Sequence, residues 1–154
     1  MPNSNHDILK LSHQLCFPLY ACSREIIKRY KPHLDPLDLT YTQYITMLVL
    51  WEKKCLNVKE LGECLFLDSG TLTPLLKKLE AKGLLTRQRS ARDERNLMVS
   101  ITPLGEELKE KALEIPAKMA KCVCLSPEES LELYQLLYKL LEQAPPISVD
   151  AEIE

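Results

Sequence analysis

The chain has 154 residues, a net charge of −2 at pH 7 and 45% hydrophobic side chains. This length fits a single domain with a core of its own, but it is short for an enzyme with a deep cleft. No run of about 18 apolar residues occurs and no signal-peptide pattern opens the chain, so we expect a cytoplasmic protein without a membrane segment. In that reducing compartment the six cysteines should rest as thiols.

The charge is unevenly distributed along the chain. Between Asp68 and Arg95, seven Lys and Arg residues accompany four Asp and Glu residues, a balance of +3. From Glu128 to Glu154, seven acids accompany a single Lys, a balance of −6. A locally basic centre can bind phosphate while an acidic C-terminus stays in solvent, so the middle of the chain is the candidate for nucleic-acid binding.

The first predicted element is a long amphipathic helix from residue 8 to about residue 30, because its apolar residues recur every three or four positions. Pro18 interrupts this helix. A proline inside a helix has no N–H to donate and its ring opposes an earlier carbonyl, so we expect a kink two residues after Cys16. Lys31-Pro32 should end the helix.

Two capping patterns follow. Thr40 and Gln43 can satisfy each other's backbone donors, and they open a helix over residues 41–53 that is apolar nearly all round and should be buried. Asn57 and Glu60 repeat the pattern and open a short helix.

The stretch from Leu67 to Gly83 predicts a capped helix. Thr73-Pro74 is also a start signal, but we favour a start at Asp68 or Ser69, because a proline distorts the first turns least. Asp68 would repel DNA if it were free, so it should cap the helix or orient a neighbouring arginine. One face should pack in the core through Leu72, Leu75, Leu76 and Leu79. The opposite face suits phosphates and base edges and carries Ser69, Thr71, Thr73, Lys77 and Lys78.

This helix and the short one before it predict a helix-turn-helix with the second helix as the DNA reader. Two strands with alternating side chains, residues 85–89 and 97–101, then flank a charged link over residues 90–96 and predict a hairpin. The fold class is therefore mainly α with a small β-hairpin wing, a winged helix. Three arginines of this region are placed for phosphate or a narrow minor groove: Arg87, Arg92 and Arg95.

The C-terminal third predicts two further helices. Thr102-Pro103 starts one that should run to about Lys121 with a bend at Pro116. Ser126-Pro127 starts the last, whose apolar face is wider than a single neighbour needs. Together with the first helix, this face suggests a subunit interface. Residues 144–154 contain three acids and two prolines, and we expect a flexible acidic tail.

Over residues 8–143 this order of helices resembles the MarR family of dimeric bacterial transcription regulators. Three segments resemble its organic-hydroperoxide-sensing branch: Gln14-Leu15-Cys16-Phe17, Leu39-Thr40-Tyr41 and Phe66-Leu67-Asp68-Ser69-Gly70-Thr71-Leu72-Thr73-Pro74. Asp93-Glu94-Arg95 is similar to the family's wing motif, whose arginine enters the minor groove. The resemblance implies dimerisation helices at residues 8–35 and 103–143 and a DNA-binding lobe at residues 40–102.

The resemblance also implies that Cys16 is the sensor, a thiol near the dimer interface that organic hydroperoxide oxidises to sulfenic acid. The tyrosines with which this branch holds the thiol match Tyr30 and Tyr41, with Tyr20, one helical turn from Cys16, as a third. Their hydroxyls can donate hydrogen bonds to a thiolate. Pro18 departs from the pattern, which has an ordinary helix former at that place.

Cys122 and Cys124 precede the final helix. As in the two-cysteine members of the branch, one of them can resolve the oxidised Cys16 of the other subunit as a disulfide; otherwise Cys16 pairs with a small cellular thiol. Their spacing is not that of a zinc site and the three histidines lie far away in the chain, so we expect no metal and no cofactor. The remaining cysteines are assigned to scaffold helices and the core: Cys22, Cys55 and Cys64.

We therefore interpret the chain as a homodimeric, redox-sensing repressor and not as an enzyme. It should bind a palindromic operator in double-stranded DNA when reduced and release it when Cys16 is oxidised. In one alternative a small phenolic ligand in the dimer cleft takes the place of oxidation, as in the wider family. In another the chain is a thiol peroxidase, although it lacks an alternating strand–helix pattern to carry a peroxidatic cysteine.

Overall fold

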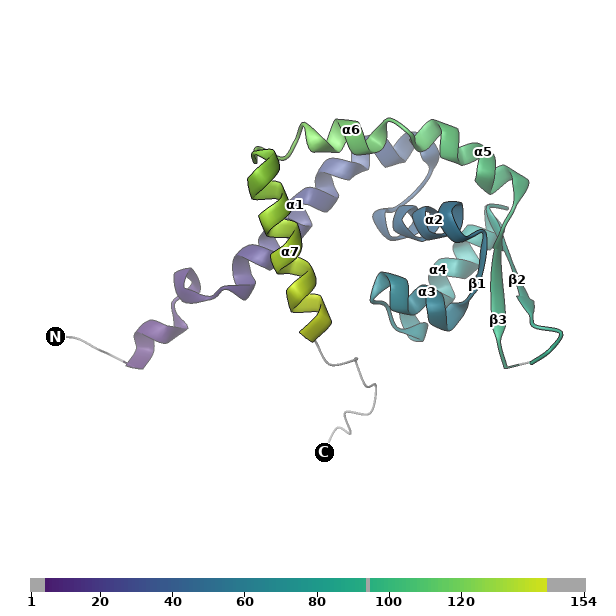
Figure 1. The fold of residues 1–154 in the computed structure, drawn as a ribbon, viewed down its shortest axis with the longest axis horizontal. Helices are drawn as coiled ribbons and strands as arrows, with labels where there is room; N and C mark the ends of the chain where they lie inside the picture. Colours follow the sequence, from purple (N-terminus) through teal and green to yellow (C-terminus); the bar gives the residue numbers. More distant parts are fainter. Residues whose placement is uncertain (1–4, 94, 144–154) are drawn as a thin grey trace.

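The computed structural model describes residues 5–93 and 95–143 (Figure 1). Three short 3-10 helices lie at Asn5–Leu9, Leu11–His13 and Asp35–Leu37. The predicted tail, residues 144–154, lies outside the described residues. The remaining elements are, in order, α1 (Cys16–Leu34), α2 (Tyr41–Lys53), β1 (Cys55–Asn57), α3 (Val58–Leu65), α4 (Ser69–Ala81), β2 (Leu85–Arg89), β3 (Leu97–Ile101), α5 (Pro103–Ala112), α6 (Ile115–Ala120) and α7 (Pro127–Gln143).

Helices α2, α3 and α4 and the small sheet form one lobe, from which the β2–β3 hairpin projects (Figure 1). Helices α5 and α6 lead away from this lobe to α7, and α6 packs against α1. In the described part of the chain, no helix is long and apolar enough to cross a membrane. The mainly helical winged-helix architecture is as predicted.

The three strands form an antiparallel sheet in the order β1-β3-β2. β2 and β3 pair along their full length, with Leu85 opposite Ile101, which confirms the predicted hairpin. β1 pairs with β3 through Leu56 and Val99, and the sequence pattern does not predict it. Three residues are too few for an alternating pattern to appear.

The leucine stripe of α4 lies in the core, as predicted. Removing each such side chain from water stabilises the fold by about 1.5–3 kcal/mol. Helix α2 supplies the facing side chains and is buried on most of its surface, which confirms that prediction too. The buried side chains of these two helices include Leu72, Leu75, Leu76, Leu79, Tyr44, Met47, Leu50 and Trp51.

Side-chain caps set where the helices of the lobe begin. The Thr40 hydroxyl accepts a hydrogen bond from the N–H of Gln43, while Gln43 Oε1 accepts one from the N–H of Thr40 at 3.0 Å. Asn57 and Glu60 form the same reciprocal pair. Asp68 caps α4. Both capping boxes and the earlier start of α4 are therefore confirmed.

The ends of α1 differ from the prediction. The helix begins at Cys16 and not at Ile8. Pro18 is therefore its third residue, where the missing N–H has no intrahelical acceptor to lose, so the predicted kink is wrong. The predicted end at Lys31-Pro32 is wrong as well. Pro32 lies within the last turn of α1, where its missing hydrogen bond does not stop the helix from reaching Leu34.

The C-terminal helices begin as predicted, with Thr102 and Ser126 as caps. The bend predicted at Pro116 is instead a break. Helix α5 ends at Ala112, and α6 begins at Ile115 with Pro116 as its second residue, where proline fits the helix without loss.

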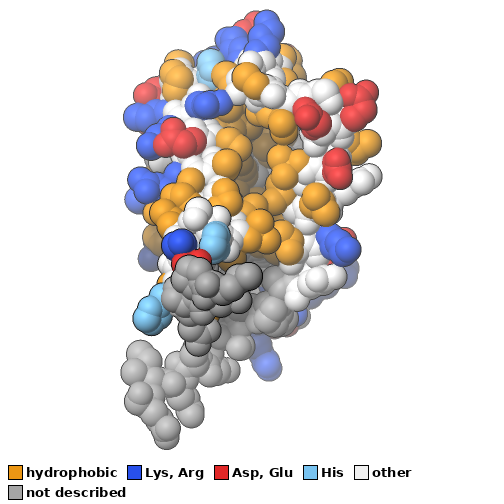
Figure 2. Space-filling view, turned by 90° about the vertical axis from the view of Figure 1, so that its left-hand side faces the viewer, with side chains coloured by type: hydrophobic (Ala, Val, Ile, Leu, Met, Phe, Trp, Pro, Cys, Tyr) orange, Lys and Arg blue, Asp and Glu red, His pale blue; other side chains and the backbone are white. Residues whose placement is uncertain are grey.

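Helix α7 has no buried residue. Figure 2 shows hydrophobic side chains gathered around a hollow on the side of the molecule formed by α1 and α7. An exposed apolar area of this kind marks an interaction surface. We give the name apolar face to the exposed hydrophobic side chains of α7, of the N-terminal part of α1 and of its N-cap, which include Leu15, Phe17, Tyr20, Leu131, Leu133, Tyr134, Leu137 and Tyr138.

Candidate DNA interface and thiol site

The polar side of the reader helix α4 faces solvent. Thr71 Oγ1 donates to Asp68 Oδ2 at 2.9 Å, and Thr73 Oγ1 donates to the carbonyl of Ser69 at 2.8 Å. These two hydroxyls therefore offer acceptor oxygens to a ligand, whereas the lysines offer donors. All five residues predicted to read DNA are exposed: Ser69, Thr71, Thr73, Lys77 and Lys78.

Asp68 is held as the cap of this helix. Its Oδ1 accepts a hydrogen bond from the N–H of Thr71 at 2.8 Å. This bond and the one from the Thr71 hydroxyl hold the pKa of Asp68 below its usual range. Its negative charge also lies at the positive end of the helix dipole, where it is stabilising. The structure therefore gives Asp68 the capping role that was predicted.

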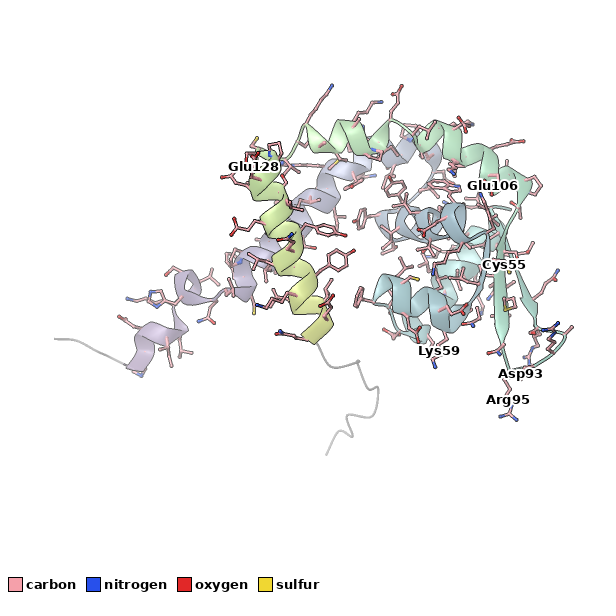
Figure 3. The ribbon with its side chains drawn as sticks, in the orientation of Figure 1. Cys55, Lys59, Asp93, Arg95, Glu106 and Glu128 are labelled. Carbon is pink, nitrogen blue, oxygen red and sulfur yellow. The ribbon has the colours of Figure 1, made fainter. Side chains whose placement is uncertain are left out.

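The tip of the wing is organised by Asp93. Asp93 Oδ1 accepts a hydrogen bond from the N–H of Arg95 at 3.0 Å, and its carbonyl accepts one from the N–H of Asn96 at 2.9 Å. Arg95 then points away from the body of the protein at the end of the wing (Figure 3). Arg92 is exposed on the same loop. Both arginines are therefore free to reach a ligand beyond the wing.

Arg87 is placed differently from these two arginines. Its Nε and Nη2 donate to Glu80 Oε2 at 3.0 and 2.7 Å, and its backbone N–H donates to Glu80 Oε1 at 2.9 Å. The guanidinium holds the pKa of Glu80 below its usual range. This pair joins α4 to β2, so the charge of Arg87 is already balanced within the protein.

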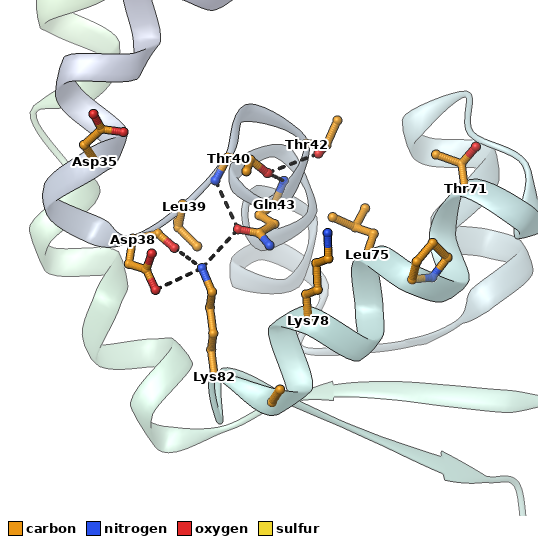
Figure 4. A pocket seen from close by; sticks show the side chains of 12 residues that line it. Asp35, Asp38, Leu39, Thr40, Thr42, Gln43, Thr71, Leu75, Lys78 and Lys82 are labelled. Atoms are coloured by element: carbon orange, nitrogen blue, oxygen red, sulfur yellow. Dashed lines mark hydrogen bonds and ion pairs between the residues drawn. The ribbon is translucent and has the colours of Figure 1, made fainter.

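A groove of about 790 Å³ lies between α4 and the start of α2 (Figure 4). Thr40 and Thr42 line it on the side of α2, and Thr71, Lys78 and Lys82 line it on the side of α4. The groove therefore borders two of the side chains predicted to read DNA.

The predicted sensor Cys16 is the first residue of α1, and it is exposed. An anion at this position would face the unpaired N–H groups of the first helical turn. Tyr20 lies one turn further along and is also exposed. Its hydroxyl accepts a hydrogen bond from Arg24 at 3.1 Å. Cys16 therefore lies in the sequence between Leu15 and Phe17 of the apolar face, one helical turn before Tyr20 of the same face.

Tyr30 and Tyr41 lie together, with ring centroids 4.9 Å apart, and Tyr44 packs against Tyr30 at 5.8 Å. Burial raises the pKa of the Tyr30 and Tyr41 hydroxyls, so both remain donors at neutral pH. Tyr30 is separated from Cys16 by 14 residues of one continuous helix, which is about 21 Å at the rise of an α-helix. Within one chain, therefore, these tyrosines do not contact the sensor thiol.

The two candidate resolving cysteines lie near the other end of α1. Arg29, which is about 20 Å from Cys16 along the helix, donates through its Nη1 to the carbonyl of Cys122 at 2.6 Å, so Cys122 lies beside the C-terminal half of α1. Cys122 is half-buried, whereas Cys124 is exposed. A disulfide requires Cα atoms no more than about 7 Å apart, so Cys16 and Cys122 of one chain cannot be joined in this conformation.

Cys22, Cys55 and Cys64 were predicted to belong to the core, and the structure shows that this prediction is wrong. All three are exposed, and Cys55 lies on β1, where it accepts a hydrogen bond from Ser100, and not on a helix. An apolar pattern along the sequence does not say which side of an element faces solvent, and in this structure the two helical cysteines and Cys55 of β1 all lie on exposed sides. Among the described residues, no three or more His, Cys, Asp or Glu side chains lie together in a way that could hold a metal ion.

Sequence reasoning missed Glu80 and Tyr44 as members of these sites, and it predicted no contact within the protein for Lys82. Glu80 and Arg87 flank the turn at Gly83 with opposite charges, which is the only local signal for their pair. Tyr44 follows Tyr41 by three residues and therefore shares its helix face. Nothing in the sequence indicates what Lys82 contacts.

The fold and the polar face of α4 define a winged-helix DNA-binding protein. The family model described as transcriptional regulator SarA/Rot matches residues 28–113. The organic hydroperoxide resistance transcriptional regulator of Bacillus subtilis (strain 168) is 53% identical over 136 residues, which cover 88% of this chain and 92% of that protein.

Solved structures agree with these matches. Reduced AbfR bound to DNA is 33% identical, with a TM-score of 0.74 over 89% of this chain and 96% of that one, and AbfR also has a disulfide-formed structure (TM-score 0.62, 33% identical). A MarR variant from E. coli complexed with operator DNA has the same fold (TM-score 0.72, 24% identical, 88% and 96% covered). The chain therefore belongs to the SarA/Rot family of winged-helix transcriptional regulators, which share the MarR fold. These relatives are regulators and not enzymes, and the predicted likeness to the hydroperoxide-sensing branch is confirmed.

Proposed function

We propose that this protein is a redox-sensing transcriptional repressor in the cytoplasm. It binds a palindromic operator while Cys16 is reduced and releases the DNA when organic hydroperoxide oxidises Cys16. The observation that carries the proposal is an exposed thiol at the first residue of α1, in a chain 53% identical to an organic hydroperoxide resistance regulator.

The apolar face supports a homodimer, because a second copy of the chain would remove these side chains from water. A two-fold dimer presents two copies of α4 to successive major grooves, about 34 Å apart, with the wings in the flanking minor grooves. The two-fold symmetry of the protein is then matched by a palindromic operator. Helices α1 and α7 supply the interface, and α2 to β3 supply the DNA-binding lobe.

The dimer also completes the sensor. Tyr30 and Tyr41 lie too far from Cys16 within one chain, but the first turn of α1 belongs to the apolar face that the second copy covers. The tyrosine pair of one protomer therefore holds the Cys16 thiolate of its partner by hydroxyl hydrogen bonds. In this arrangement, the environment of each Cys16 thiolate depends on contacts across the dimer interface.

The reaction begins when the Cys16 thiolate attacks the terminal oxygen of the hydroperoxide. An S–O bond forms, the O–O bond breaks, and the displaced alkoxide takes up a proton to leave as an alcohol. The product is a sulfenic acid. A second thiol then attacks the sulfenic sulfur, which forms an S–S bond and releases water. That thiol comes from Cys122 or Cys124 across the interface, or from a small cellular thiol.

A gel-shift assay with a promoter fragment tests the proposal. Reduced wild-type protein should bind, and addition of an organic hydroperoxide should release the DNA. Cys16→Ser should bind equally well and stay bound, whereas Cys22→Ser, the matched control on the same helix, should respond as the wild type does. Persistent binding by the oxidised wild type would overturn the proposal. Release of Cys16→Ser by a phenolic compound would instead favour regulation by a ligand.

A further inference from the structure

Lys82, at the C-cap of the reader helix, is held by the junction between α1 and α2 (Figure 4). Its Nζ forms an ion pair with Asp38 Oδ2 at 3.0 Å, donates to the carbonyl of Asp38 and donates to Gln43 Oε1 at 3.3 Å. The side chain of Lys82 is only 28% exposed, whereas that of Asp38 is 88% exposed. Lys82 therefore reaches inward to the junction.

The acceptors of Lys82 are themselves fixed in place. Asp38 adopts the left-handed conformation, with φ 52° and ψ 43°, immediately after the 3-10 turn that follows α1. Gln43 is almost fully buried, and its Oε1 also accepts the hydrogen bond from the N–H of Thr40 that starts α2. One ammonium group therefore joins the end of α4 to the point where the chain turns from α1 into α2.

Lys78 lies one turn earlier on the same helix and lines the same groove. Its side chain is exposed, and among the residues that the structure describes no hydrogen bond or ion pair holds its ammonium group. Two lysines four residues apart therefore differ in one respect. Lys78 is available to a ligand, and Lys82 is engaged within the protein.

We propose that Lys82 is a positioning residue that transmits a change in α1 to the reader helix. Helix α1 is continuous from Cys16 to the junction that Lys82 binds, so a displacement at its first turn moves the far end too. The three contacts of Lys82 then carry that movement to α4. This inference rests on the proposed redox function and names the path by which oxidation alters DNA binding.

The test compares Lys82→Gln with Lys78→Gln in the full chain. The affinity for a promoter fragment is measured by fluorescence anisotropy for the reduced and the hydroperoxide-treated protein, each over a range of salt concentrations. In Lys82→Gln the ratio of oxidised to reduced Kd should shrink at least about fivefold, the lower end of typical coupling between sites. The salt slope should stay that of the wild type. In Lys78→Gln the ratio should persist, while the slope flattens by about 0.9 for a lost phosphate contact.

Asp38→Asn is a second variant that tests the coupling even if Lys82→Gln does not fold. It removes the charge that pairs with Lys82, whereas asparagine accepts the left-handed conformation and keeps the backbone carbonyl acceptor. Asp38→Asn should also lower the ratio of oxidised to reduced Kd, and its melting temperature should stay close to that of the wild type. An unchanged ratio in both Lys82→Gln and Asp38→Asn would overturn the coupling alone. If hydroperoxide does not release the promoter fragment from the wild-type protein, both the proposed function and the coupling through Lys82 are contradicted.

Discussion

At the scale of single residues, Arg95 and Arg87 show how surroundings decide what a cation does. Arg95 points outward from the tip of the wing, whereas Arg87 is bound by Glu80 and only 18% exposed. A free cation can displace counterions from DNA phosphates. A cation paired with a carboxylate adds almost no net charge and acts instead on the position of its strand.

Arg95→Ala should weaken operator binding and flatten the slope of log affinity against log salt by about 0.9 if the side chain meets one phosphate. A salt titration by fluorescence anisotropy measures this slope. Lys111→Ala removes an exposed cation from α5, away from the wing, and should leave the slope as it is. Equal slopes for Arg95→Ala and the wild type would contradict the assignment.

Arg87→Ala should also weaken binding, because β2 loses its link to α4, but the salt slope should remain that of the wild type. Arg87→Ala and Glu80→Gln should each lower the melting temperature. Their double variant should fall short of the summed effect, since the two side chains form one pair. A slope as flat as that of Arg95→Ala would show that Arg87 meets phosphate directly.

At the scale of elements, the start of the reader helix depends on the charge of Asp68. Because the pKa of this carboxyl is lowered in the folded protein, its contribution to stability is complete above the ordinary value of about 3.9. That contribution is lost as pH falls through the lowered pKa.

Asp68→Ala should therefore lower the melting temperature at neutral pH, and the difference from the wild type should shrink as the pH falls below the ordinary aspartate pKa of about 3.9. Asp68→Asn keeps a capping oxygen without the charge and should lie between the two at neutral pH. Thermal unfolding, followed by circular dichroism at neutral and at acidic pH, measures the differences in melting temperature between the variants and the wild type. A difference that does not change with pH would mean that the charge of Asp68 is irrelevant to the cap.

At the scale of the whole molecule, the apolar face predicts that α7 holds two protomers together. Leu137→Lys should place a charge in that interface, shift the protein toward monomers and weaken operator binding with it. Sedimentation velocity measures the oligomeric state. Glu132→Lys, on another side of α7, should leave the dimer intact. A dimer that persists in Leu137→Lys would place the interface elsewhere.

A mixed dimer tests whether the sensor is completed across the interface. One protomer carries Cys16→Ser and the other carries Tyr30→Phe. If the tyrosine serves the partner's thiol, the only remaining Cys16 faces an intact Tyr30, and it should oxidise at the wild-type rate. If the tyrosine serves the thiol of its own chain, that Cys16 should oxidise as slowly as in the Tyr30→Phe homodimer. Mass spectrometry of the sulfenic acid, trapped with dimedone, distinguishes the two rates.

Much of the fold follows from signals that are local in the sequence. The caps Thr40, Asn57 and Asp68, the leucine stripe of α4 and the wing hairpin depend on residues a few positions apart, so the sequence alone determined them. The roles proposed for Cys16 and Arg95 also depend on short segments of sequence, since they come from the resemblance of the surrounding motifs to those of the family, and they stay predictions.

Only the tertiary structure decided which of these residues meet. The pair Lys82–Asp38 and the third strand β1 join segments that no short pattern connects. Opposite charges on either side of the turn at Gly83 are the only local signal for the pair Glu80–Arg87. The structure also placed Pro18 in the first turn of α1, where it causes no kink, and packed Tyr30 of α1 against Tyr41 of α2. Helix starts depend on hydrogen bonds within one turn, whereas contacts between distant segments depend on how all the elements pack, and the sequence of one element does not contain that information.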